Sequence, residues 1–193
     1  MMAQTQQEEK TNLGAKKFNM WIFIFTSFMF FAALSSGFIV YSGGRGHGLD
    51  VIMPRAFLYS TVIIVLSSVT LFIASRAAKQ SQVEKQRLYL WVTFFLGIAF
   101  FVAQFYAFYV LAYKMEIRFT DSNASHTFIY VFCGMHLLHI IAALALLLTT
   151  IRASYRNTSQ VINLFKMEMT SIFWHFLDII WIYLYVFLLL NQY

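Results

Sequence analysis

The chain has 193 residues, of which 60% are hydrophobic and 11% are charged, whereas a soluble domain carries about 25% charged residues. Its 22 Phe, 11 Tyr and 4 Trp, against one Pro and 8 Gly, exclude disordered, collagen-like and Gly-rich repeat proteins. The one cysteine, Cys133, excludes an intramolecular disulfide and any Cys-ligated zinc or iron–sulfur site built by this chain alone. We therefore expect one compact domain that is surrounded mostly by lipid.

Five windows that are nearly free of charge predict five membrane-spanning helices. They cover residues 18–41, 56–75, 88–113, 127–151 and 169–190. A spanning helix needs about 20 apolar residues, whereas strands of a membrane barrel give windows of about 10 residues that alternate apolar and polar. The expected fold class is therefore an all-α integral membrane protein, with a single five-helix domain over residues 18–193.

The basic residues predict the orientation of this domain. Residues 1–17 are polar and lack the apolar core of a signal peptide, so we interpret them as a retained cytoplasmic tail. Of the 14 Lys and Arg, ten lie in this tail, between the second and third windows, or between the fourth and fifth. The positive-inside rule then places the N-terminus in the cytoplasm and the C-terminus outside. The net charge of +6 follows from this topology, and it gives no reason to expect nucleic acid as a partner.

Two of the polar connections between the windows predict different conformations. The segment 42–55 holds half of the glycines and Pro54, so we expect it to be irregular. The segment 76–87 is rich in helix-forming residues and is predicted to extend one or both of the flanking helices into the cytoplasm.

Four ionisable groups lie inside the predicted spans, where an unpaired one costs at least about 2.5 to 3.5 kcal/mol. His136 and His139 belong to the fourth span and His175 and Asp178 to the fifth, with Glu168 at the cytoplasmic mouth of the fifth. Each pair has i, i+3 spacing and therefore shares one helical face. We expect His175 and Asp178 to be close enough to hydrogen-bond.

Three interpretations of these groups compete. Haem ligation by neutral imidazoles is the first, but a two-haem cytochrome needs two well-separated histidines on each of two helices, and no span has that spacing. A proton relay is the second, but the first three spans contain no carboxylate, Lys, Arg or His to continue it. We favour the third, in which these groups satisfy one another and hold the fourth and fifth helices together, or hold both to a partner subunit.

Further polar and aromatic positions favour packing roles. The serines and threonines of the second span allow close helix contact, and Gln104 is expected to be a hydrogen-bond tie. Cys133 is expected to be a small buried hydrophobic residue. The Phe-rich first span is expected to face acyl chains or another subunit.

The end of the chain resembles a known family. Residues 174–186, WHFLDIIWIYLYV, with Glu168 seven residues before His175, resemble the closing motif of subunit III of the haem-copper oxidases. The residues of this motif singled out here are Trp174, His175, Asp178 and Trp181.

Three earlier segments resemble the same family in the same order. GMHLLHIIAALALL, with His136 and His139, is similar to its G-x-H-G-x-H segment, and LGIAFFVAQFYAF, with Gln104, is similar to its LGxxFxxxQxxEY. STVIIVLSSVTLFIAS is similar to its NTxxLLxSSxT stretch. The resemblance covers residues 18–190 and fits the short, five-helix form of the family.

This resemblance implies a supporting role. A family member holds no haem, copper or other cofactor of its own, packs against the catalytic subunit I and other oxidase subunits that carry haem and copper, and holds phospholipid in a cleft between two helix bundles. It keeps the oxidase stable over many turnovers and supports proton uptake at the cytoplasmic side. The implied location is the bacterial inner membrane, and a respiratory supercomplex is a further candidate partner.

The sequence also departs from the family. Ser27 stands where the family often has a Glu in S-E-x-x-F-F, Ala107 and Phe108 replace the Glu-Tyr after Gln104, and Leu137 replaces a Gly. Because two carboxylates are lost, we expect any proton role to be indirect, and we expect no catalytic residue in this chain. The open alternatives are subunit III of a quinol oxidase or of a nitric-oxide reductase and, from another class, a stand-alone transporter or cytochrome.

Overall fold

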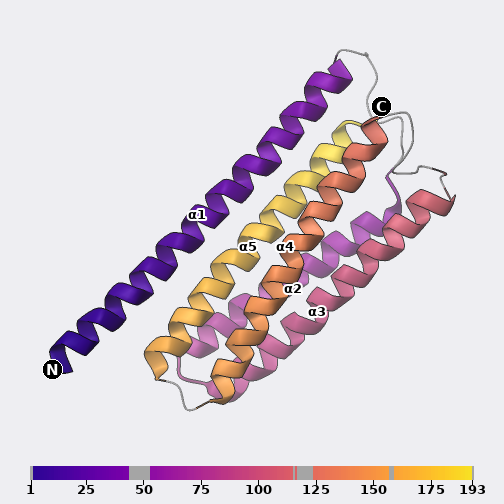
Figure 1. Cartoon of the computed structure of the whole chain (residues 1–193). Helices are drawn as coiled ribbons and strands as arrows, with labels where there is room; N and C mark the ends of the chain where they lie inside the picture. Colours follow the sequence, from indigo (N-terminus) through magenta and orange to yellow (C-terminus); the bar gives the residue numbers. More distant parts are fainter. Residues whose placement is uncertain (1, 44–52, 115, 117–123, 157–158, 193) are drawn as a thin grey trace.

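The computed structural model describes the chain except for residues 1, 44–52, 115, 117–123, 157–158 and 193. Its elements are the helices α1 (Met2–Gly43), α2 (Arg55–Lys79), α3 (Val83–Tyr109), α4 (Ala124–Tyr155) and α5 (Gln160–Leu190), with a π-helical turn η1 (Val110–Lys114) that continues α3. The helices run alternately in opposite directions, so the start of α1 and the end of α5 lie at opposite ends of the molecule (Figure 1).

The five predicted spans are confirmed as helices. Within the described residues, five helices are long and apolar enough to cross a membrane. The helices are longer than the predicted windows, because helix formation continues where the side chains become polar. Thus α1 includes the predicted tail, and α5 begins at Gln160 rather than at residue 169.

The connection between α2 and α3 is a tight turn. The prediction that segment 76–87 extends its flanking helices is confirmed, because α2 ends at Lys79 and α3 begins at Val83. The N–H of Gln82 donates to the carbonyl of Ala77 at 3.0 Å, and Ser81 adopts a left-handed conformation with φ of 56°. This arrangement satisfies carbonyls at the end of α2 and holds the two helices side by side. Most of the predicted irregular segment 42–55 lies outside the described residues.

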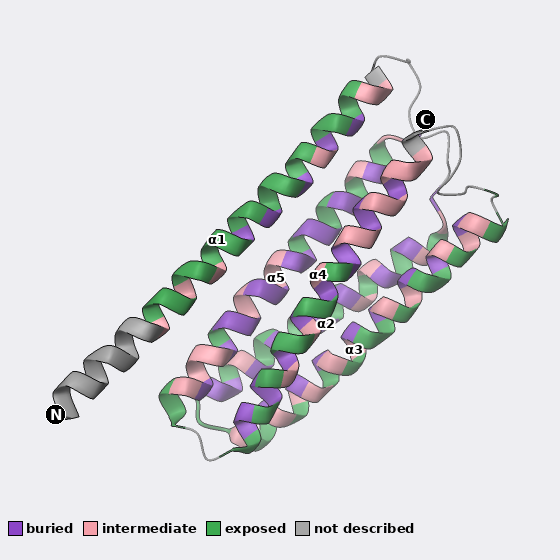
Figure 2. Ribbon diagram, in the orientation of Figure 1, coloured by how far each residue is buried: buried purple, intermediate pink, exposed green. Residues whose placement is uncertain are grey.

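Helices α2, α3, α4 and α5 form a closed four-helix bundle, and α1 lies along one side of it. In the bundle, α2 packs on α3 and α5, and α4 packs on α3 and α5. By contrast, α1 contacts only α4 and α5 among the described helices. Over residues 13–42, the buried residues of α1 form one narrow stripe at helical spacing, and most of the remaining surface is exposed (Figure 2). The stripe consists of Ile24, Ser27, Phe31, Ser35 and Phe38.

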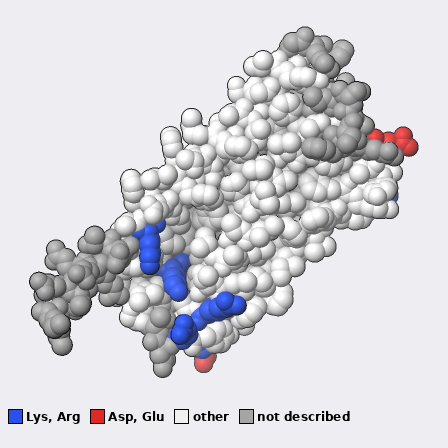
Figure 3. All heavy atoms as spheres, in the orientation of Figure 1, with Lys and Arg blue, Asp and Glu red and all other residues white. Residues whose placement is uncertain are grey.

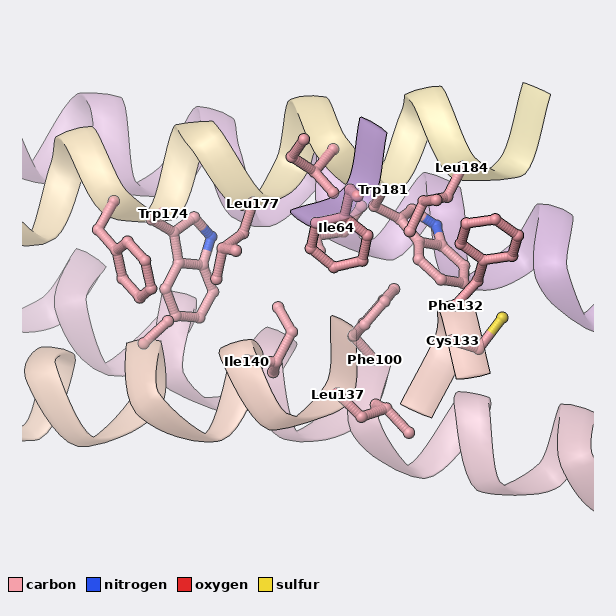
Figure 4. Close-up of a cluster of buried hydrophobic side chains, with 14 of the residues drawn as sticks. Ile64, Phe100, Phe132, Cys133, Leu137, Ile140, Trp174, Leu177, Trp181 and Leu184 are labelled. Atoms are coloured by element: carbon pink, nitrogen blue, oxygen red, sulfur yellow. The ribbon is translucent and has the colours of Figure 1, made fainter. Parts of the chain in front are cut away.

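The centre of the bundle is filled by large side chains from all four of its helices. Trp174 and Trp181 of α5 point inward toward Phe100 of α3 and Ile140 of α4 (Figure 4). Cys133 lies in the same cluster and is fully buried, as predicted. The motif tryptophans therefore lie in the core of the bundle and not on the surface that would face lipid.

Candidate functional site

A row of hydroxyl groups on α2 forms hydrogen bonds with the polar side chains of the closing motif on α5. Trp181 Nε1 donates to Thr61 Oγ1 at 3.0 Å, and Trp174 Nε1 donates to Ser67 Oγ at 3.1 Å. Because α2 and α5 are antiparallel, positions seven residues apart on α5 meet positions six residues apart on α2. The serines and threonines of α2 thus do more than allow close approach, since they satisfy indole N–H groups inside the membrane.

Ser68, the third hydroxyl of this row, contacts His175. His175 Nδ1 lies 2.7 Å from Ser68 Oγ and 3.7 Å from Asp178 Oδ2. The expected contact within the pair is therefore present only at ion-pair distance, and Ser68 is the closer partner of the imidazole. Asp178 is buried, and its two carboxylate oxygens have no hydrogen-bond partner among the described residues.

Glu168 takes part in a different contact. Its Oε1 lies 2.6 Å from Nζ of Lys17, and this ion pair joins the start of the first predicted span to the start of the fifth. Both side chains are about half exposed. Glu168 and His175 also line one groove of about 560 Å³ between α2 and α5, together with Ser75, Lys79 and Ser171.

The two histidines of α4 point to different neighbours. His139 Nε2 lies 3.2 Å from Ser27 Oγ on α1, and its Nδ1 lies 2.7 Å from the carbonyl oxygen of Met135. His136 is fully buried, and neither ring nitrogen has a hydrogen-bond partner among the described residues. Its ring packs on Trp181 at 5.0 Å and on Phe100 at 5.9 Å between ring centroids.

These groups were predicted to satisfy one another and hold α4 to α5, or to hold both helices to a partner subunit. Among the described residues, His175 and Asp178 lie at ion-pair distance from each other, and the hydrogen bonds of the histidines to other helices go to α2 and α1. His175 contacts Ser68 of α2, and His139 contacts Ser27 of α1. His136 does touch α5, but through ring packing on Trp181. The physical reason is that i, i+3 spacing separates two side chains by about 60° around a helix, enough to direct them to different neighbours in a closed bundle.

Polar pairs that sequence reasoning did not single out join the helices elsewhere. Thr150 Oγ1 and Thr170 Oγ1 lie 2.7 Å apart between α4 and α5. The amides of Gln86 and Asn163 bind each other reciprocally at 3.1 and 3.2 Å between α3 and α5, and both are buried. Thr150 and Thr170 lie near the ends of predicted spans, whereas Gln86 and Asn163 lie in the polar connections between spans, so no signal in the sequence marked them as partners.

Gln104 and Ala107 lie on the inner face of α3. Gln104 Nε2 donates to Ser60 Oγ of α2 at 2.8 Å, which is the hydrogen-bond tie expected from the sequence. Ala107 is fully buried, and Ser27 is 5% exposed. Both departures from the family's carboxylates therefore lie at buried positions, where an ionised carboxylate would need a buried partner.

The arrangement as a whole holds helices together. Within the described part of the chain, no three His, Cys, Asp or Glu side chains come together in a way that could hold a metal ion. The polar contacts named above join α2 to α5, α2 to α3, α3 to α5, α4 to α5, α1 to α4 and α1 to α5. Such contacts fix the packing of helices in lipid. Burial of apolar side chains alone gives little preference there for one helix neighbour over another, because lipid tails are also apolar.

Comparison with known proteins identifies the family of the chain. Residues 4–192 match the family model described as Cytochrome c oxidase subunit III. The chain is 24% identical over 182 residues to cytochrome c oxidase subunit 3 of Alkalihalophilus pseudofirmus, covering 92% of this chain and 88% of the relative.

Two relatives carry a different name. The chain is 27% identical to cytochrome bo(3) ubiquinol oxidase subunit 3 of Buchnera aphidicola subsp. Schizaphis graminum, covering 95% of this chain and 97% of the relative. It is 29% identical to the protein of the same name from Pseudomonas aeruginosa, covering 88% of this chain and 81% of the relative.

Proposed function

Since the chain belongs to the cytochrome c oxidase subunit III family, we propose that it is the accessory subunit III of a respiratory haem-copper terminal oxidase. In this role it stabilises the catalytic subunit I and supports proton uptake and sustained turnover, and it has no redox centre of its own. The observation that carries the proposal is the family match over residues 4–192. The helix-to-helix polar contacts support it, because they suit a scaffold.

The proposed partners follow from the family. Subunit I is the main contact, haem and copper belong to partner subunits, and phospholipid binds to this chain. Large apolar side chains on the outer face of α1, including Phe18, Trp21 and Phe25, are more than half exposed and support the need for a covering layer of lipid or protein. A respiratory supercomplex remains a further proposed partner, which a native gel of mildly solubilised membranes would test.

We propose the bacterial inner membrane as the location, with the N-terminus in the cytoplasm. The start of α1, the α2–α3 turn and the α4–α5 connection lie at one end of the bundle (Figure 1), and these segments carry ten of the 14 basic residues. Labelling tests this orientation in a Cys133→Ala background. A membrane-impermeant thiol reagent should reach Glu116→Cys from outside and Gln82→Cys only after the membrane is opened; labelling of both from one side would contradict it.

Co-purification tests the main proposal. The chain, tagged at its N-terminus and isolated in mild detergent from its own membranes, should bring a haem-bearing partner that reduces oxygen, and the separated chain should show no haem absorbance. Haem that stays with the separated chain, or solute transport by the chain alone in liposomes, would overturn it. Neither a nitric-oxide reductase subunit nor a stand-alone transporter or cytochrome is favoured by the relatives described above.

A quinol oxidase is the second candidate, because relatives from Buchnera and Pseudomonas carry a ubiquinol oxidase name. We place cytochrome c first as the electron donor because the family description names it. Oxygen consumption by the purified complex with reduced cytochrome c, compared with consumption with ubiquinol, separates the two.

A further inference from the structure

A groove of about 560 Å³ lies between α2 and α5, at the end of the bundle where α2 ends and α5 begins. We call it the α2–α5 groove, and its volume lies within the range of ligand sites, about 300 to 1,000 Å³. Both helices contribute polar side chains to its lining. These are Ser75 and Lys79 of α2 and Glu168, Ser171 and His175 of α5.

The polar residues of α5 lead from the end of the bundle toward its middle. Glu168, Ser171 and His175 have i, i+3 and i+7 spacing, so they share one face of the helix. His175 therefore lies about 10 Å further along the helix axis than Glu168. Glu168 precedes the fifth uncharged window and His175 lies inside it. On the face that Figure 3 shows, the charged side chains of the described residues likewise gather toward the two ends, and the surface between them is uncharged.

Three of the groove's polar side chains have a hydrogen-bonding atom without a protein partner. Nδ1 of His175 lies 2.7 Å from Ser68 Oγ and 3.7 Å from Asp178 Oδ2. Its Nε2, by contrast, has no hydrogen bond within the described part of the chain. The hydroxyl groups of Ser75 and Ser171 also form none with the described residues.

Contact with lipid would leave these groups unsatisfied. An acyl chain offers neither a donor nor an acceptor, and a polar group without a hydrogen bond in an apolar medium is costly. Ionisable residues inside membrane spans face either the interior of the bundle or a water-filled cavity. The side chain of His175 is 33% exposed and lines the groove, so it does not face the interior alone. The second environment therefore suits it.

The α2–α5 groove meets the requirements of bound water. A water molecule occupies about 30 Å³ in the liquid and needs two to four polar partners, so the groove has room for several. Because Ser68 meets His175, the antiparallel register places Ser75 beside Glu168, and polar groups follow one another along both walls. We propose that this groove is an aqueous inlet, in which a file of water molecules runs from Lys79 and Glu168 at its mouth to Nε2 of His175.

The inlet accounts for an imidazole and a carboxylate at this depth. Water can donate or accept, so it satisfies Nε2 of His175 in either tautomer. Nδ1 then serves Ser68 and Asp178, whose buried carboxylate oxygens have no hydrogen-bond partner among the described residues. The inference rests on the proposed function only for placing the chain in a membrane, and it assigns no proton transfer to the groove.

Cysteine accessibility tests the inlet. Ser171→Cys is introduced into the oxidase complex in a Cys133→Ala background, in open membrane sheets that let a charged methanethiosulfonate reagent reach both sides. The thiolate is the reacting form, and it forms in water rather than in hydrocarbon. Ser171→Cys should therefore react at least about tenfold faster than a lipid-facing cysteine at the same depth.

Ile73→Cys is the matched control. Ile73 follows the groove residue Phe72 on α2 and is 37% exposed, but it does not line the groove. The register set by Ser68 and His175 places it close to the level of Ser171. Equal rates for the two cysteines would overturn the proposal. Failure of Ser171→Cys to react would also overturn it, because lipid or a partner helix would then fill the groove.

A second measurement needs no variant and so guards against misfolding. Radiolysis of water by X-rays gives hydroxyl radicals, which modify side chains that touch water. Phe72 lines the groove and is 54% exposed, whereas Phe25 on the outer face of α1 is 64% exposed. In the wild-type complex, mass spectrometry should show faster modification of Phe72 despite its smaller exposed fraction, and the opposite order would contradict the inlet. Co-purification with oxidase subunits is measured separately, so failure of the inlet and failure of the proposed function are distinguishable.

Discussion

Trp174 of α5 donates its indole N–H to Ser67 Oγ of α2 at 3.1 Å, and the Ser67 hydroxyl in turn donates to the carbonyl of Ile64 at 2.7 Å. Both Trp174 and Ser67 are almost completely buried. The far edge of the indole ring lies against Gly97 of α3. One residue of the closing motif thus fixes the relative positions of three helices.

The first prediction concerns Ser67→Ala. This substitution leaves a buried indole N–H without an acceptor, which costs about 0.5 to 2 kcal/mol in membrane proteins. We expect a lower midpoint of thermal denaturation, measured by fluorescence-detected size-exclusion chromatography. Thr26→Ala is the control, because Thr26 is exposed and its hydroxyl donates only to the carbonyl of Phe23. Equal midpoints for the two variants would show that the Trp174 contact is energetically unimportant.

The second prediction compares two glycines within helices. A Cβ atom at Gly97 would lie 2.8 Å from Trp174 Cη2 and 2.9 Å from Leu144 Cδ2, whereas one at Gly134 would meet nothing within 4 Å. Gly97→Ala should therefore destabilise the bundle by about 1 to 3 kcal/mol through overpacking. Gly134→Ala should be neutral or stabilising by up to about 1 kcal/mol, since Ala has the higher helix propensity. A denaturation series that ranked the two variants in the opposite order would refute this packing.

The five spans could be predicted from the sequence because one free energy, the cost of placing a charged side chain in hydrocarbon, decides which segments can cross the membrane. Charged side chains are costly in hydrocarbon, so gaps between them mark the crossings. The helix ends were not predicted in the same way. Asn163, Lys166 and Glu168 are compatible with helix outside the hydrocarbon, so α5 extends through them to Gln160. Composition therefore locates the lipid-facing core of each helix, and local hydrogen bonding decides where the helix begins and ends.

The partners of the buried polar groups could be predicted only in part. Spacing placed His175 and Asp178 on one face of α5, but the neighbour on that face is Ser68 of α2. Which helices touch depends on how the bundle closes, and periodicity within a single helix does not contain that information. The contact between His139 and Ser27 is a further case, because it joins residues 112 positions apart.

The third prediction concerns the ion pair that joins α1 to α5. Lys17 and Glu168 are about half exposed, so their interaction is worth at most about 1 kcal/mol and should weaken as salt screens it. A double-mutant cycle with Lys17→Gln and Glu168→Gln should give a coupling of that size at low salt and a smaller one at 0.5 M salt. Coupling that does not change with salt would indicate a contact other than this ion pair.

The last prediction concerns Asp178, whose carboxylate is buried 3.7 Å from His175 Nδ1. Because Ser68 remains a partner of the imidazole at 2.7 Å, Asp178→Ala leaves His175 with one contact rather than none. The His175 side chain is also 33% exposed, so the loss should be at most about 1 kcal/mol. Ser68→Ala removes the closer contact instead and should cost at least as much.

Both substitutions are expected to loosen the subunit without slowing the chemistry. In the isolated oxidase complex, we expect less of this chain retained in detergent, or fewer turnovers before inactivation, while the initial oxygen-reduction rate of intact complexes stays near normal. The reason is that the contacts of His175 join α2 to α5 and therefore act on helix packing. The decisive comparison is the initial rate at full subunit retention. A large drop in that rate with an unchanged haem spectrum would mean that His175 and Asp178 take part directly in proton or oxygen delivery, and the supporting role would have to be abandoned.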